Sequence, residues 1–187
     1  MIKFYTNREL SQIFSIKLAK WKRWSREFLP PDALGGLQSG YARQYNLDEA
    51  FTVFLGGHLV GELKFTIPES RQILDDLKQW LLDHEFYFDF SGKANSRNKP
   101  VQPVQYYQIA VLCTNIPDAV ISGLVYRIKA TITSEPVNYG GVPMHQERYV
   151  ESTMGVQTHE PGLYVKSYRI INISLLRKSF LDYFKTV

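Results

Sequence analysis

The sequence predicts an α+β fold in which a mainly helical amino-terminal domain precedes a domain built on an antiparallel β-sheet. Up to about residue 83, apolar residues recur at helical spacing and the segments begin with good helix caps. From Gln105 onward the chain is rich in β-branched and aromatic residues, and several segments alternate apolar with polar side chains. We therefore expect domains at residues 1–90 and 105–187. Residues 91–104 are polar, contain Gly and Pro and lack acids, which is typical of a linker.

The first helix is predicted to begin at Thr6, because Glu9 follows three residues later. Together they form a capping box, in which each side chain accepts a hydrogen bond from a backbone N–H group at the helix start. The apolar face of this helix comprises Leu10, Ile13 and Phe14. A break is expected at residues 14–16, where Ser15 can bond its own backbone and open a second helix.

The second helix is unusually basic. Residues 17–26 contain five basic side chains and no acidic one, whereas a helix face that is merely solvated usually mixes both signs. The basic residues are Lys17, Lys20, Lys22, Arg23 and Arg26. An apolar stripe is expected from Leu18, Trp21, Trp24 and Phe28, with both tryptophans in the core. A short helix, a turn and a basic second helix are typical of the helix-turn-helix, whose second helix enters the major groove of DNA.

Three further elements are expected before residue 90. Pro30 and Pro31 end the second helix, and residues 32–40 hold three glycines that favour a loop or a tight two-stranded excursion. Residues 40–45 alternate aromatic and polar side chains, as expected for the return strand of a β-wing with Arg43 facing out and Tyr45 facing in. Helices are then predicted from Asn46 to near Gly61 and from Thr66 to about Asp83.

This order of elements resembles the DNA-binding domain of MerR-type transcriptional regulators, a winged helix-turn-helix followed by a helix pair. The resemblance covers roughly residues 4–82 and rests on Tyr5-Thr6, Glu9-Leu10, Arg26-Glu27, Leu29-Pro30-Pro31, Gly40-Tyr41, Arg43-x-Tyr45, Asp48-Glu49, Phe65-Thr66 and Glu69. It implies that the recognition helix and the wing face DNA. With the basic residues above, the DNA-binding set we expect is Lys17, Ala19, Lys20, Lys22, Arg23, Arg26, Tyr41 and Arg43.

In the second half, strands are predicted in QYYQIAVLCT, GLVYRIKATITS, HQERYVESTMGV and LYVKSYRIINIS, and a terminal amphipathic helix covering the sheet is predicted in LLRKSFLDYF. Turns fit at residues 115–118, 138–141 and 160–162. The even-numbered residues 126–132 should form one buried strand face. MerR-type regulators usually dimerise through a long helix where this chain has its linker, so a homodimer would form through the β domain or the terminal helix.

Charge and composition narrow the class of function. Residues 1–45 carry eight basic and three acidic side chains, residues 46–90 three and nine, and the remainder eleven and six. A basic surface beside an acidic one suggests nucleic acid on one side only. The single cysteine, Cys113, excludes an internal disulfide and a thiolate metal sensor, and we interpret it as a buried strand thiol.

No constellation for catalysis is apparent. His145 with Glu147 and His159 with Glu160 are the only clustered side chains of ligand character, and we interpret them as exposed turn residues. The chain has no phosphate-binding loop, dinucleotide fingerprint or Cys-x-x-Cys pair. We therefore expect no enzyme, no cofactor and no metal site.

The sequence thus favours a sequence-specific protein that binds double-stranded DNA, a cytoplasmic transcriptional regulator whose β domain senses a small molecule or contacts a protein. The sequence lacks an apolar run long enough for a membrane span, so no membrane partner is expected. Two alternatives remain open. One is a protein–protein adaptor whose winged module binds an acidic partner, and the other is an architectural or recombination-directionality protein that bends DNA.

Overall fold

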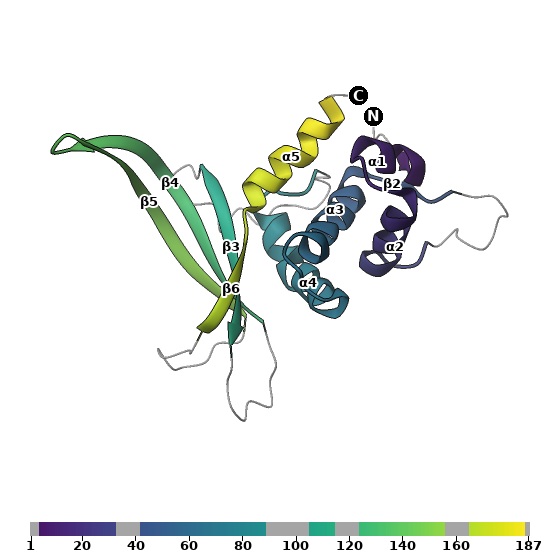
Figure 1. Cartoon of the computed structure of the whole chain (residues 1–187). Coiled ribbons are helices and arrows are strands. Elements are labelled where there is room, and N and C mark those ends of the chain that lie inside the picture. Colours follow the sequence, from purple (N-terminus) through teal and green to yellow (C-terminus); the bar gives the residue numbers. More distant parts are fainter. Residues whose placement is uncertain (1–3, 33–41, 89–104, 115–123, 156–164, 186–187) are drawn as a thin grey trace. The chain divides into compact units, whose positions relative to one another are not determined.

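The computed structural model describes residues 4–32, 42–88, 105–114, 124–155 and 165–185 (Figure 1). The predicted α+β layout is confirmed, with helices, a four-stranded antiparallel sheet and a carboxy-terminal helix. The chain divides into two compact units, one of residues 1–98 and 177–187 and the other of residues 99–176. The sequence had placed the whole terminal helix with the sheet, whereas the division falls inside that helix.

The helical unit contains β1 (Tyr5–Thr6), α1 (Asn7–Ile13), α2 (Leu18–Phe28), β2 (Gln44–Tyr45), α3 (Leu47–Gly61) and α4 (Ile67–Asp83). Strand β2 pairs antiparallel with β1. Capping boxes start α1, α3 and α4: Thr6 with Glu9, Asn46 with Glu49, and Thr66 with Glu69. All three predicted helix starts are therefore confirmed, and so are the predicted ends near Gly61 and Asp83.

The turn between α1 and α2 is short and lies at the predicted break. Ser15 adopts a left-handed conformation with φ of 52°, and its N–H donates to the Gln12 carbonyl at 3.0 Å. The role predicted for Ser15, opening α2, is wrong. Lys17 occupies the N-cap position, and its side chain makes no capping hydrogen bond. The left-handed Ser15 instead closes α1, where the Ile16 N–H donates to the Ser11 carbonyl at 2.9 Å.

An aromatic core holds the helical unit together. Trp21 is fully buried on α2, and its neighbour Phe14 has a ring centroid 5.4 Å away. Helix α5 (Ile173–Lys185) contributes Phe180, whose ring lies 5.4 Å from that of Phe14 and 5.2 Å from that of Phe51. The expectation that the terminal helix covers the sheet is therefore wrong for its second half, because these large rings pack with the helical unit.

Two adjacent glycines let α2 approach α3 closely. A Cβ atom on Gly56 would lie 2.4 Å from the ring of Phe28, and one on Gly57 would lie 2.3 Å from the ring of Trp24. Real Cβ atoms do not come so near, so any side chain at these positions would push α2 away from α3. The spacing of the basic helix from the core thus depends on residues 56 and 57.

The second unit is a sheet with strand order β5-β4-β3-β6, formed by β3 (Tyr106–Thr114), β4 (Val125–Tyr139), β5 (Val142–Gly155) and β6 (Val165–Ile171). Each strand lies where it was predicted, although β4 and β5 run longer. The predicted turn at 138–141 is confirmed, with φ of 59° at Gly140 and 86° at Gly141. The turns predicted at 115–118 and 160–162 fall outside the described residues.

The predicted alternation along β4 holds only in part. Tyr126 and Ile128 are buried and Arg127 is exposed, as expected. The strand register shifts between Thr131 and Thr133, and Thr131 is buried although the alternation had placed it on the polar face. The bulge reverses the side on which the residues after it point, so from Thr133 onward the odd-numbered residues of β4 share the face of Ala130, which a strict period of two cannot anticipate.

A candidate nucleic-acid interface on α2

Helix α2 has a buried side and a basic side. Trp21, Trp24 and Ser25 are buried. The other side carries Ala19, Lys22, Arg23 and Arg26, all exposed and spaced i, i+3, i+4 and i+7, so that they form one stripe along the helix. We refer to these four residues as the basic stripe. Both tryptophans lie in the core as predicted.

The described part of the chain does not neutralise the cations of the basic stripe. Within the described residues, Lys22, Arg23 and Arg26 form no ion pair with an acid. Glu27, the single acid of α2, is held by Arg71 of α4, with 2.5 Å between the guanidinium nitrogen and the carboxylate oxygen. The positive potential of the stripe is therefore available to an external anion.

The remaining basic residues of α2 lie outside this stripe. Lys20 is exposed, and its ammonium nitrogen lies 4.6 Å from the centroid of the Trp24 ring. Lys17 is exposed at the N-cap. Leu18 was expected in the buried apolar stripe. That expectation is wrong, because 38% of Leu18 is exposed. The predicted cations thus form a stripe of three, with Lys20 beside it over the Trp24 ring and Lys17 at the start of the helix.

An open groove of about 1090 Å³ runs beside the stripe. Its described lining comprises Thr6, Asn7, Arg8, Leu18, Ala19, Lys22, Ser25, Arg26, Leu29, Pro30, Pro31, Asp32, Ala42, Arg43 and Tyr45. Exposed Arg8 from α1 therefore shares the groove with Lys22 and Arg26. The sequence analysis missed Arg8, because the side to which α1 presents it depends on how α1 crosses α2.

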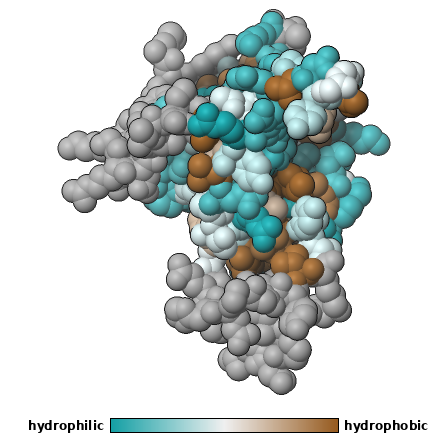
Figure 2. All heavy atoms as spheres, turned by 90° about the vertical axis from the view of Figure 1, so that its left-hand side faces the viewer, coloured by the Kyte–Doolittle hydropathy of each residue, from teal (hydrophilic) through white to brown (hydrophobic). Residues whose placement is uncertain are grey.

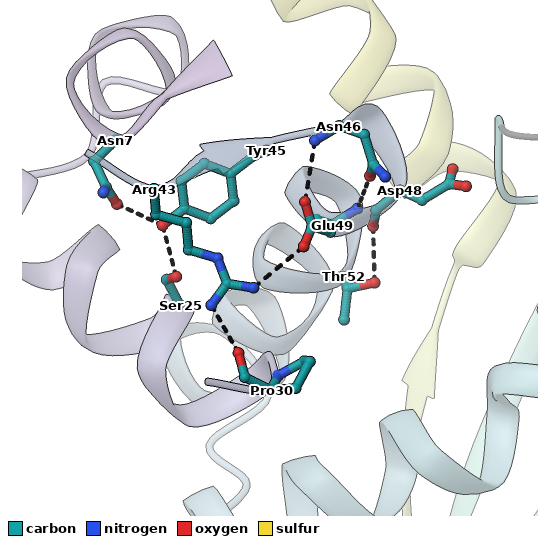
Figure 3. A network of polar contacts seen from close by, with 9 residues as sticks. All are labelled: Asn7, Ser25, Pro30, Arg43, Tyr45, Asn46, Asp48, Glu49 and Thr52. Atoms are coloured by element: carbon teal, nitrogen blue, oxygen red, sulfur yellow. Dashed lines mark hydrogen bonds and ion pairs between the residues drawn. The ribbon is translucent and has the colours of Figure 1, made fainter. Parts of the chain in front are cut away.

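Tyr45 ties three elements together beneath the groove (Figure 3). Its hydroxyl donates to Asn7 Oδ1 at 2.6 Å and lies 2.7 Å from the Ser25 hydroxyl, which must then donate to it. Burial raises the pKa of the Tyr45 phenol, which keeps the donating proton in place. As predicted, Tyr45 faces inward, and only 1% of it is exposed. The network fixes α1, α2 and β2 relative to one another.

The expectation that Arg43 faces outward is wrong. Its side chain is only 16% exposed and donates to the Pro30 carbonyl at 2.8 Å and to Glu49 Oε1 at 3.2 Å (Figure 3). Glu49 also caps α3, where its other oxygen accepts from the Asn46 N–H at 3.2 Å. Acceptors within the chain therefore satisfy this guanidinium, which links the end of α2 to the start of α3. Tyr41 lies outside the described residues.

Replacing Arg43 with alanine should lower the free energy of unfolding by about 2 kcal/mol, because a largely buried charged donor with two acceptors is lost. Urea titration followed by tryptophan fluorescence measures this loss. Arg43→Lys should recover only part of it, since one ammonium cannot reproduce the forked geometry. Suppose instead that Arg43→Ala left stability unchanged and flattened the salt dependence of DNA binding. The structural role of Arg43 in linking the end of α2 to the start of α3 would then be wrong.

His145 and Glu147 were interpreted as exposed turn residues, but both lie in strand β5, and only His145 is exposed. Glu147 accepts from Lys129 at 2.6 Å and from the Tyr106 hydroxyl at 2.5 Å, and these hydrogen bonds lower the pKa of its carboxyl group. His145 Nε2 lies 2.6 Å from the Ser134 hydroxyl. Across the described ranges, His, Cys, Asp and Glu do not gather in a group that could hold a metal. His159 and Glu160 fall outside these ranges.

Comparisons with known proteins add no family to this description. A scan against protein-family models and searches of the curated proteins and of the solved structures gave no match to the chain. None of the helices in the described part of the chain is long and apolar enough to cross a membrane.

Proposed function

We propose that this chain is a sequence-specific protein that binds double-stranded DNA, a MerR-like transcriptional regulator of the cytoplasm with a sensing or protein-contact role for its sheet unit. The observation that carries the proposal is the basic stripe. Its three cations share one exposed helix face, and within the described residues they have no acid partner. An exposed cationic helix face is the electrostatic footprint expected for a helix that enters the major groove.

The residues of the stripe suit different parts of this task. Arg23 and Arg26 carry forked guanidinium groups, each of which can pair with two oxygens of a phosphate. Ala19 has a small side chain, which permits close approach of the helix to base edges. Lys22 and Arg8, on the groove side, and Lys20, on the flank, are placed to neutralise phosphates.

Binding of the full chain to labelled duplex fragments, measured by fluorescence anisotropy over a range of salt concentrations, tests this function. The logarithm of the association constant should fall linearly with the logarithm of the salt concentration, by about 0.9 for each phosphate contacted. Selection from a random duplex library should enrich a defined sequence. Absence of salt-sensitive binding to duplex DNA would refute the proposal.

The same stripe suits an acidic protein, and the same assay separates the two functions. An adaptor would bind a DNA-mimicking acidic protein in a salt-sensitive manner without binding duplex DNA. An architectural protein would bend the duplex in the absence of any effector, which energy transfer between dyes at the duplex ends detects.

A further inference from the structure

Strands β4 and β5 extend beyond the rest of the sheet. Strand β3 pairs with β4 only along residues 125–131 of β4. Residues 133–148 continue as a two-stranded ribbon closed by the Gly140-Gly141 turn, visible in Figure 1 as the hairpin that runs past β3. We refer to residues 133–148 as the arm. A two-stranded ribbon alone is only marginally stable in water, so a long arm of this kind is expected to dock on another surface.

One face of the arm is apolar toward its tip. Tyr139 pairs with Val142 and Val137 pairs with Met144, and because opposed residues share a face, these four side chains lie together. Tyr139 is 79% exposed, Val142 60% and Met144 53%. Exposed hydrophobic groups are also apparent among hydrophilic side chains in Figure 2. An uncovered cluster of this size and composition indicates an interaction surface.

This apolar face continues the buried face of the sheet. Further along β5, Val150 lies on the same side as Met144 and is 57% exposed, opposite Ala130. The next residue of β4 on that side is Ile128, which is buried. The face of the sheet that is buried where β3 pairs with β4 is thus exposed along the arm of a single chain.

The edges of the arm are poorly suited to adding a further strand. Pro136 lies in β4 opposite His145, and Pro143 lies in β5 opposite Asn138. A proline within a strand is tolerated where its nitrogen faces away from the partner strand, so each free edge lacks a donor. A partner of the arm therefore packs against its face.

The charges on this face complement one another across a two-fold axis. Glu135 on β4 and Arg148 on β5 share the apolar face, are exposed and form no ion pair within the described part of the chain. A two-fold axis along the arm places β4 of one copy over β5 of the other. Glu135 then comes beside Arg148 of the second copy, twice, next to the apolar cluster at the tip of the arms. Such a surface selects its own copy.

We propose that the chain forms a homodimer in which the arms of two copies pack through the face of Val137, Tyr139, Val142 and Met144. On the opposite face, Lys129 and Glu147 form an ion pair with each other. This inference concerns the sheet unit alone, and it holds whether or not the helical unit binds DNA.

Light scattering and sedimentation equilibrium at micromolar concentrations test the dimer. The full chain should have twice its mass of 21.7 kDa, and Tyr139→Ser with Met144→Ser should return it to the monomer. The matched control is Tyr168→Ser with Ile170→Ser on β6, where exposed apolar residues (60% and 45%) lie on the opposite face, and it should stay dimeric. A monomeric wild type, a dimeric arm variant or a dissociated control would each overturn the proposal.

Charge exchange tests the pairing without removing apolar surface. Glu135→Arg alone should raise the dimer dissociation constant at least about tenfold, because two like pairs face each other. Combining it with Arg148→Glu should restore the constant to within about threefold of wild type. Circular dichroism confirms that each variant is folded. Equal weakening by the single and the double exchange would contradict the two-fold arrangement.

Discussion

Replacing Arg23 and Arg26 together with alanine is expected to weaken binding to duplex DNA by about 30-fold near 0.15 M salt. Each cation that neutralises a phosphate contributes about fivefold at this salt concentration, according to the counterion-release slope. Both side chains are exposed on the basic stripe and have no acid partner in the described residues, so their removal leaves no unpaired carboxylate behind. Anisotropy titrations at several salt concentrations measure both the affinity and its slope, which should flatten by about two.

A matched control separates this docking mode from general attraction to a polyanion. Lys78 on α4 and Lys178 on α5 are exposed, and replacing both with alanine removes the same charge from other helices. This control should change the affinity by less than about threefold. Equal losses in the two variants would mean that α2 does not dock on DNA. Unchanged affinity in the variant with both Arg23→Ala and Arg26→Ala would also mean that α2 does not dock on DNA.

The helix starts could be predicted from the sequence because their determinants are local. Thr6, Asn46 and Thr66 each have a glutamate three residues later, and each capping box closes within one turn. The strands of the second unit were located for a similar reason, since β-branched and aromatic composition marks them without knowledge of their partners. The spacing of the basic stripe was also present in the sequence, as i, i+3, i+4 and i+7 from Ala19.

The position of a side chain could not be predicted from the sequence where it depends on residues that meet it only in the folded protein. Arg43 was expected to face outward, but its acceptors at Pro30 and Glu49 are separated from it along the chain and meet it only in the folded unit. Phe180 was predicted to lie on the apolar side of a helix that covers the sheet, although its ring packs against Phe14, far away in sequence. Periodicity indicates which face of a helix is apolar, but it cannot identify what that face covers.

Gly57→Ala is expected to destabilise the helical unit by about 2 kcal/mol, although alanine is intrinsically the better helix former by about 1 kcal/mol. The added Cβ would lie 2.3 Å from Cζ3 and 2.4 Å from Cε3 of Trp24. The indole is rigid and only 7% exposed, so relief requires α2 to move away from α3. Urea titration followed by the tryptophan fluorescence of the three indoles, all in the helical unit, measures the loss.

Gly61→Ala provides the control for this prediction, because it makes the same change on the same helix. There the new Cβ would lie 3.9 Å from Trp24, an ordinary contact, so stability should stay constant or rise by up to about 1 kcal/mol. Since Trp24 lies on the buried side of α2, moving it should also displace the basic stripe, and Gly57→Ala should weaken DNA binding where Gly61→Ala does not. A Gly57→Ala protein as stable as the Gly61→Ala protein would show that close packing against α3 does not set the position of α2.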